Sequence, residues 1–177
     1  MIGRGGFVAR FLLIFAALAA LGWLTRAPHG YATALRLAGS ATCPLVNGWT
    51  LEDRTTPGGR QEIFFRKGND QLRLALGLDQ MALSLLPLLA LLGATPGLGW
   101  RRLAASAGIG IAALFALDLF ILFIYPWLVG DPNPVTDIIG TFLGLLTFVG
   151  GPVILWFVLT YPQLRGVWQL DRPRVAR

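Results

Sequence analysis

Residues 103–129 read LAASAGIGIAALFALDLFILFIYPWLV, and this stretch decides the fold class. It holds one charged residue, Asp118. A helix that crosses about 30 Å of hydrocarbon needs about 20 residues, because each residue advances it by about 1.5 Å. The stretch is therefore long enough and apolar enough to be a transmembrane helix.

Three further apolar runs accompany it, at residues 11–25, 81–99 and 138–162. The last two reach or nearly reach spanning length, and the first is marginal. The sequence thus predicts an all-α membrane protein with four transmembrane helices and a small extracytoplasmic β-hairpin segment between the first two. This divides the chain into an N-terminal transmembrane helix (1–25), an extracytoplasmic segment (26–78), a three-helix transmembrane bundle (79–164) and a basic cytoplasmic tail (165–177).

The composition also indicates a membrane protein. Of the 177 residues, 55% are hydrophobic and 14% are charged, whereas about a quarter are charged in a typical soluble domain. The net charge of +6 does not indicate nucleic-acid binding, because the basic residues flank the apolar runs and form no stripe with aromatic residues. The lipid bilayer is the expected partner.

Basic residues beside the apolar runs predict the orientation, since cytoplasmic loops are enriched in Lys and Arg. Arg101 and Arg102 separate the second and third runs, whereas the loop at 130–137, GDPNPVTD, has two acids and no base. Four crossings then place both termini in the cytoplasm, with the chain in the inner membrane of a bacterium. The seven basic residues within 26–78 weaken this orientation.

The N-terminal run has a second interpretation. Arg4 and Arg10, followed by FLLIFAALAALGW (11–23), resemble the basic and apolar regions of a signal peptide. No small-x-small cleavage site closes the run, because the residues at 23–26 are WLTR. An uncleaved helix is therefore favoured, and N-terminal sequencing of the mature protein distinguishes the two.

In the segment before the second apolar run, the spacing of apolar residues changes from a helical period to the alternation of a strand. EIFFRK (62–67), a turn at 68–70 and QLRLALGL (71–78) indicate a β-hairpin. Leucines alternate in the last stretch, so four of them share one face. A sheet of this size is marginal alone in water. Its leucine face must be covered by the bilayer surface, by the chain's own helices, or by a partner that docks by strand addition.

A helix within 31–46 and a strand at 49–54 are also expected.

Asp118 is the most informative polar residue. A carboxylate in the middle of a membrane helix costs about 2.5–3.5 kcal/mol on insertion scales, and it normally faces the interior of a bundle. The apolar runs hold no Lys or Arg to pair with it. We expect it to be protonated, or hydrogen-bonded to Ser84, Thr141 or Thr147. A polar clamp between helices is the favoured role, and a proton, ion or headgroup site is the alternative.

Small residues recur every four positions on the third and fourth helices. Gly108 and Ala112 belong to one row, and Gly140 and Gly144 belong to another. This spacing lets helix backbones approach closely in lipid. We therefore expect these two helices to pack tightly, chiefly against each other.

No catalytic, cofactor or metal site is predicted. The sequence has one cysteine, Cys43, and one histidine, His29, which exclude a disulfide framework and a multi-histidine metal site. The two lie 14 positions apart in a stretch expected to be loop-like, with no acid nearby to orient the histidine. Thiol catalysis is therefore disfavoured, and the protein is predicted not to be an enzyme.

One pattern resembles a known family. A hydrophilic strand runs into a leucine- and proline-rich helix, Leu85–Leu92, which ends in Ala94-Thr95-Pro96 and is followed by Arg101-Arg102. This order resembles the small integral membrane proteins encoded with exosortase H, and LVNGWTLEDRT (45–55) fits the start of their extracytoplasmic region. The resemblance covers residues 70–115 well and the rest in outline. It implies an accessory role beside a membrane transpeptidase that processes C-terminally anchored surface proteins.

Three functions remain open. The first, which we favour, is a non-catalytic accessory or assembly subunit of a larger inner-membrane complex, such as an exosortase protein-sorting system. Its partner would be a membrane protein bound through the extracytoplasmic segment or through the third and fourth helices. The second is a scaffold subunit of a respiratory or photosynthetic membrane complex. The third is a small transporter or lipid-handling protein that uses Asp118.

Overall fold

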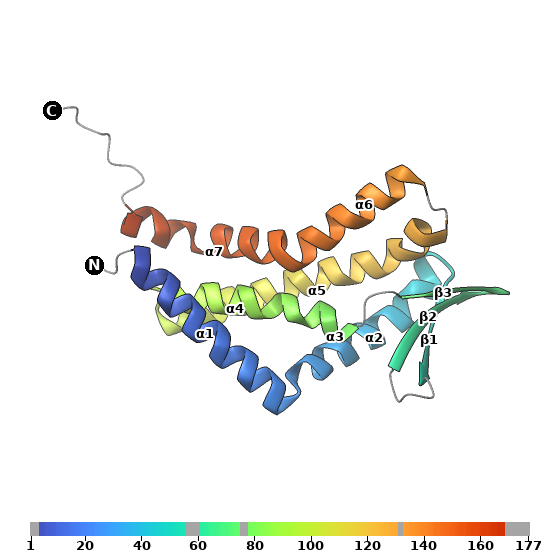
Figure 1. Cartoon of the computed structure of the whole chain (residues 1–177), viewed down its shortest axis with the longest axis horizontal. Helices are drawn as coiled ribbons and strands as arrows, with labels where there is room; N and C mark the ends of the chain where they lie inside the picture. Colours follow the sequence, from blue (N-terminus) through green and yellow to red (C-terminus); the bar gives the residue numbers. More distant parts are fainter. Residues whose placement is uncertain (1–3, 56–60, 75–77, 131–132, 169–177) are drawn as a thin grey trace.

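The computed structural model describes residues 4–55, 61–74, 78–130 and 133–168. The helices run along the long axis of the molecule, some of them obliquely, and a small sheet caps one end (Figure 1). In chain order the elements are α1 (Arg4–Thr25), α2 (Ala27–Val46), β1 (Thr50–Thr55), β2 (Gln61–Lys67), β3 (Asp70–Arg73), α3 (Leu78–Met81), a 3-10 turn (Ala82–Ser84), α4 (Leu85–Ala94), α5 (Trp100–Gly130), α6 (Pro134–Leu145), a π-helical turn (Leu146–Gly150) and α7 (Gly151–Trp168).

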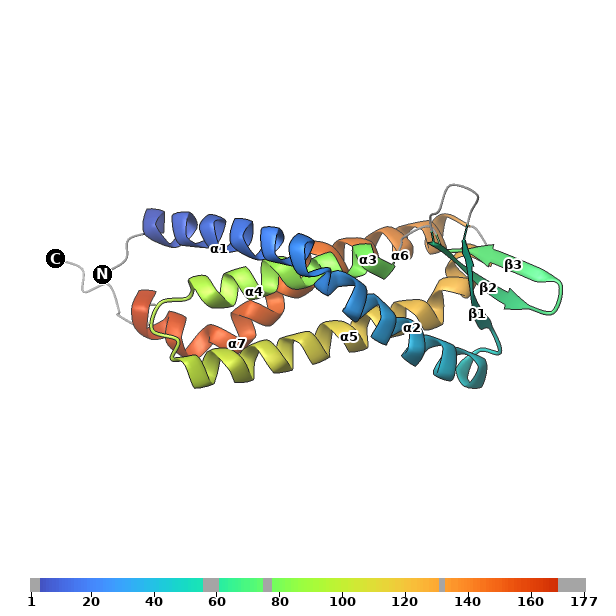
Figure 2. The same cartoon turned by 90° about the horizontal axis from the view of Figure 1, so that it is seen from below.

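Successive segments traverse the molecule in alternating directions. α1 and α2 run toward the sheet, α4 returns, α5 runs toward the sheet again, and α6 with α7 returns (Figures 1 and 2). The beginning of α1 and the end of α7 therefore lie at the same end of the molecule, opposite the sheet. This arrangement is compatible with the predicted even number of crossings.

Three of the described helices are long and apolar enough to cross a membrane, as a multi-pass membrane protein requires. They are Gly6–Thr25, Trp100–Gly130 and Pro134–Arg165. The third joins α6 to α7 through the π-helical turn. No residue in the most apolar window of the first is fully buried, although this helix contacts α7 through the rings of Phe7 and Trp156, whose centroids lie 5.8 Å apart. We expect lipid to cover the rest of its surface.

The predicted second crossing is not confirmed as a full span. Its apolar helix, Ala82–Ala94, consists of the 3-residue 3-10 turn and the 10-residue α4. Together they extend about 21 Å, short of about 30 Å of hydrocarbon. Thr95 precedes Pro96 and is extended, with ψ of 118°, because a residue before proline is disfavoured in the helical region. Gly97 then turns the chain toward α5 with φ of 77°.

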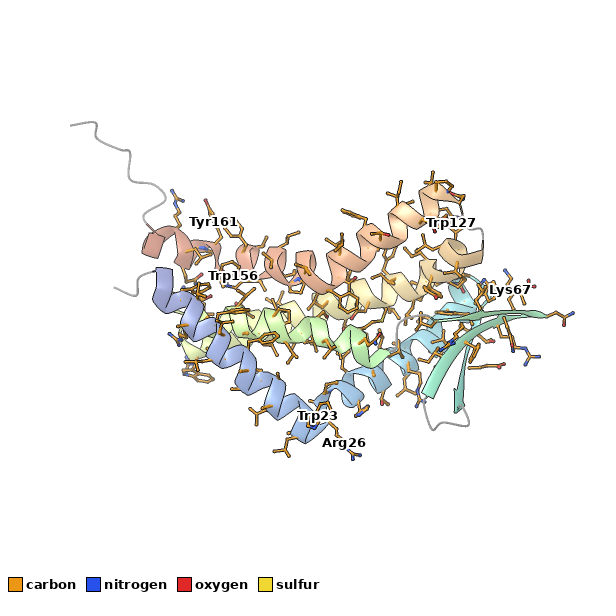
Figure 3. The ribbon with its side chains drawn as sticks, in the orientation of Figure 1. Trp23, Arg26, Lys67, Trp127, Trp156 and Tyr161 are labelled. Atoms are coloured by element: carbon orange, nitrogen blue, oxygen red, sulfur yellow. The ribbon has the colours of Figure 1, made fainter. Side chains whose placement is uncertain are left out.

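α1 and α2 meet in a bend at Arg26, whose φ of 53° is left-handed. Pro28, in the first turn of α2, has no N–H to continue the hydrogen bonds of α1, so a new helix begins there. Trp23 and Arg26 lie on the outside of this bend (Figure 3). The helix predicted within 31–46 is confirmed, and it begins earlier than expected, at Ala27.

The predicted hairpin is also confirmed. The sheet is antiparallel with the order β1-β2-β3. Lys67 faces Asp70 across a two-residue turn, and Gly68 in that turn has φ of 60°, as such turns require. β3 ends at Arg73 and is shorter than predicted. The N–H of Leu74 still donates to the carbonyl of Ile63 at 2.9 Å.

The leucine face of the sheet packs against the chain's own helices. One core cluster joins residues of the sheet to residues of α2 and α5, and it includes Leu35, Phe65, Leu74, Leu78 and Leu122. Leu72 is partly buried against the same cluster, and Leu76 lies outside the described residues. Of the three covers considered for this face, the chain's own helices are therefore the one observed.

α5 turns a row of residues inward that includes Ser106, Gly110, Leu114 and Asp118, all of them buried. A Cβ added at Gly110 would lie 2.7 Å from Leu88 of α4. This glycine therefore permits the close approach of α4 to α5.

The rows predicted for close packing do not make such contacts with other described residues. Gly108 and Ala112 of α5 are exposed, and a Cβ added at Gly108, Gly140 or Gly144 would meet nothing within 4 Å. Small residues permit close packing on whichever face the fold turns inward, and their spacing alone does not choose between neighbouring rows.

Replacing Gly110 with leucine should destabilise the bundle, because the new side chain would overlap buried Leu88. We expect a loss of about 1–3 kcal/mol in the free energy of unfolding, the usual cost of overpacking a core. Thermal unfolding in a mild detergent measures it. Gly108→Leu is the matched control, and an equal effect of both substitutions would contradict this packing.

Candidate functional site

Asp118 lies in a clamp between α2 and α5. Its side chain is fully buried, and its Oδ2 accepts a hydrogen bond from the hydroxyl of Tyr31 at 2.6 Å. The Tyr31 ring meets Phe115 of α5 edge-on, with 5.6 Å between ring centroids. The two helices are thus joined by one polar and one aromatic contact over a sequence separation of 87 residues.

The three predicted partners of Asp118 are engaged elsewhere or exposed. The Ser84 hydroxyl donates to the carbonyl of Met81 at 2.8 Å, and the Thr147 hydroxyl donates to that of Leu143 at 2.9 Å. Thr141 is exposed. The structure therefore gives Asp118 a partner that sequence reasoning missed.

Tyr31 was missed because it belongs to the segment assigned to the extracytoplasmic part. One signal could have identified it. On a helix covering 31–46, Tyr31 shares a face with Leu35, Gly39 and Cys43, the buried side of α2. A tyrosine at the end of a buried row usually directs its hydroxyl to a polar partner.

The second oxygen of the carboxyl group, Oδ1, is buried and has no hydrogen-bond partner in the described part of the chain. Within that part, no three His, Cys, Asp or Glu side chains gather into a group that could hold a metal. Tyr31 is the titratable side chain bonded to Asp118, and a proton relay would need further groups in line beyond this pair. The geometry of Asp118 and Tyr31 thus suits a clamp better than a relay.

Cys43 and His29 do not form a catalytic pair. Both lie on α2, and the 14 positions between them correspond to about 21 Å along a helix. Cys43 is buried and His29 is exposed. Burial raises the pKa of the Cys43 thiol to about 11, which lowers its reactivity because the thiolate is the nucleophile.

The sheet is fixed to the end of the bundle by side chains that bond to backbone carbonyls. The Tyr125 hydroxyl of α5 donates to the carbonyl of Arg73 at 2.8 Å, and its ring stacks on Phe65 at 5.5 Å between centroids. After α2, the Asn47 amide donates to the carbonyl of Phe123 at 2.8 Å. Both ends of the three-stranded region are thus tied to α5.

Arg101 and Arg102, which were predicted to set the topology, lie at the start of α5 and are exposed. The guanidinium of Arg101 lies 5.6 Å from the ring centroid of Trp100. This end of α5 is opposite the sheet (Figure 1). Trp156 of α7 is buried, and its indole N–H donates to the Thr95 hydroxyl at 2.8 Å.

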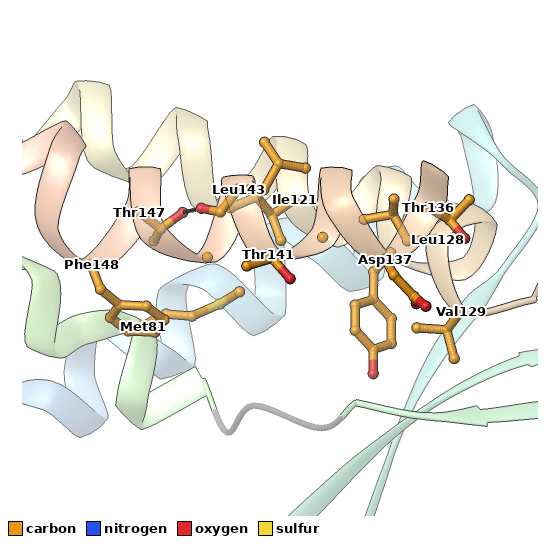
Figure 4. A pocket seen from close by; sticks show the side chains of 13 residues that line it. Met81, Ile121, Leu128, Val129, Thr136, Asp137, Thr141, Leu143, Thr147 and Phe148 are labelled. Carbon is orange, nitrogen blue, oxygen red and sulfur yellow. Dashed lines mark hydrogen bonds between the residues drawn. The ribbon is translucent and has the colours of Figure 1, made fainter. Parts of the chain in front are cut away.

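A cavity of about 230 Å³ lies between α5 and α6. Met81 and Phe148 line one end, and Asp137 and Val129 line the other (Figure 4). Thr141, one of the predicted polar residues, points into the space between them (Figure 4). Gly140 and Gly144 contribute part of the α6 wall.

No protein family, curated protein or solved structure matches the chain.

Removing the hydroxyl in Tyr31→Phe should destabilise the protein by about 1–3 kcal/mol, because Asp118 would lose its observed partner while staying buried. In the double variant Tyr31→Phe with Asp118→Leu, both polar groups are gone, and the combined loss should be smaller than the sum of the single losses. Unfolding curves in detergent measure all three. Tyr161→Phe, at an exposed tyrosine, is the control, and strictly additive losses would argue against the clamp.

Cys43 should react slowly with maleimide near neutral pH in the folded protein and rapidly after denaturation in SDS. The reason is its burial and its pKa of about 11. Mass spectrometry of the labelled protein measures the rate. Fast labelling of the native protein would show that α2 opens readily from α5.

Proposed function

We propose that the chain is a non-catalytic accessory subunit of an inner-membrane complex, and that it binds its partner by strand addition to the outer edge of β1. The observation that supports this most directly is the sheet itself. Its apolar face is occupied by the chain's own helices, so its open edges are the surfaces left for pairing.

The hydrogen-bond register identifies the outward backbone groups of β1. The carbonyl of Arg66 accepts a bond from the Thr50 hydroxyl, and the carbonyl of Ile63 faces Leu74, beyond β3. Inward and outward groups alternate along an antiparallel strand. Asp53 lies opposite Ile63, whose backbone groups face β3, so the N–H and C=O of Asp53 point away from β2. The N–H and C=O of Leu51, two residues earlier, point the same way.

The other edge of the sheet suits a partner less well. β3 has 4 residues, against 6 in β1. The outward carbonyl of Arg73 already accepts a bond from Tyr125. β1 therefore offers a partner strand the longer edge for backbone pairing.

Rigid attachment favours such a role. The bonds from Tyr125 and Asn47 to backbone carbonyls hold the sheet against the bundle. A partner strand that pairs with a preformed edge loses less conformational entropy than one that must order the edge first.

The predicted orientation places this sheet outside the cytoplasm. Exposed Arg101 and Arg102 at the opposite end of the molecule support it, because cytoplasmic ends are enriched in arginine. The resemblance to proteins encoded with exosortase H makes a membrane transpeptidase the partner to look for first. Capture of the tagged chain in mild detergent, followed by mass spectrometry, names the partner.

Asp53→Pro should weaken recovery of the partner, because it removes an outward N–H that the sheet does not use internally, and proline is tolerated on an edge strand. Asp53→Ala keeps the N–H and is the matched control. Quantitative mass spectrometry of the captured complex compares the two with the native chain. Equal recovery from both variants would refute strand addition at β1. Transport or lipid turnover by the purified chain alone would refute the accessory role.

A further inference from the structure

Side chains from three helices line the cavity between α5 and α6. Ile121 and Leu128 come from α5, Leu143 and Gly144 from α6, and Met81 closes it from α3. Both α5 and α6 belong to helices that can span a membrane. The cavity therefore lies beside lipid chains, and its apolar lining does not favour water.

The two glycines on the α6 wall have no partner inside the described part of the chain. Glycine in a helix costs about 1 kcal/mol relative to alanine, and it usually lets another group approach the backbone closely. At Gly140 and Gly144 an added Cβ would meet nothing within 4 Å. This room is open to a group from outside the described residues.

The π-helical turn explains why the cavity does not close. Residues Leu146–Gly150 form this turn between α6 and α7, and α6 leans away from α5 on the sheet side of it (Figure 1). A π-turn inserts an extra residue into the helix and changes the direction of the helix axis, often at functional sites. The backbone of this helix therefore holds α6 away from α5.

Length distinguishes the occupants, because a helix that crosses the membrane spans about 30 Å of hydrocarbon, whereas one acyl chain lies within a single leaflet. A single hydrocarbon chain is slim enough to enter. The lining from Thr136 to Phe148 extends about 18 Å along the helix, close to half of about 30 Å of hydrocarbon.

Polar groups gather at the sheet end of the cavity. Asp137 is exposed there and is the charged residue among those that line it. The hydroxyl of Thr141 lies farther in (Figure 4). A carboxylate beside the mouth attracts an ammonium group and repels an anion. We propose that the cavity binds one acyl chain of a phospholipid with an amine headgroup, taken from the leaflet at the sheet end.

Native mass spectrometry of the purified full chain tests this proposal, with phosphatidylethanolamine and phosphatidylglycerol added in equal amounts. The native chain should retain one phosphatidylethanolamine in preference to phosphatidylglycerol. Gly144→Leu fills the cavity and should weaken retention at least about tenfold, which corresponds to about 1.4 kcal/mol of binding free energy. Gly140→Leu narrows the same cavity one turn away and gives an independent test if the first variant folds poorly.

Gly108→Leu is the matched control, since Gly108 also has nothing within 4 Å but lies on the exposed side of α5. It should bind lipid as the native chain does. Asp137→Asn should keep the lipid and lose the preference for the amine headgroup. Undiminished retention by both cavity variants would overturn the proposal. So would loss of a dimer in the same spectra with no change in bound lipid, because a second chain would then be the occupant.

Discussion

A partly buried hydrogen bond between two side chains joins α5 to α2, the first helix outside the long apolar helices. Tyr31 donates to fully buried Asp118, and this fixes α2 across α5. Because α2 leads directly into β1, the position of the sheet follows from the position of α2. A buried carboxyl group without a partner is costly, so the clamp favours one placement of α2 over others.

α5 contacts most of the other elements of the fold. It contacts α2 through the clamp, α4 through Gly110, the sheet through Tyr125, and it forms one wall of the cavity. These contacts lie at different heights along one 31-residue helix. The proposed partner edge and the proposed lipid cavity both lie toward its sheet end, while the arginines lie at the other.

The sequence predicted the membrane helices well where length and hydropathy suffice. α5 and the helix from α6 to α7 are found where the apolar runs indicated, and the hairpin is found where leucines alternate. The second run was less well predicted. It ends early because Pro96 forces Thr95 out of the helix, and polar residues precede it, so α4 is too short to span alone.

Composition and period by themselves determined the class of the protein, because backbone groups in lipid must bond within each helix and because alternation fixes which strand residues share a face. Only the tertiary structure decided that Tyr31 is the partner of Asp118, that Gly110 and not Gly108 packs against a helix, and that Gly140 and Gly144 border a cavity. These contacts join residues far apart in the chain. Several faces of α5 and α6 are equally small and apolar, so local pattern could not choose among them.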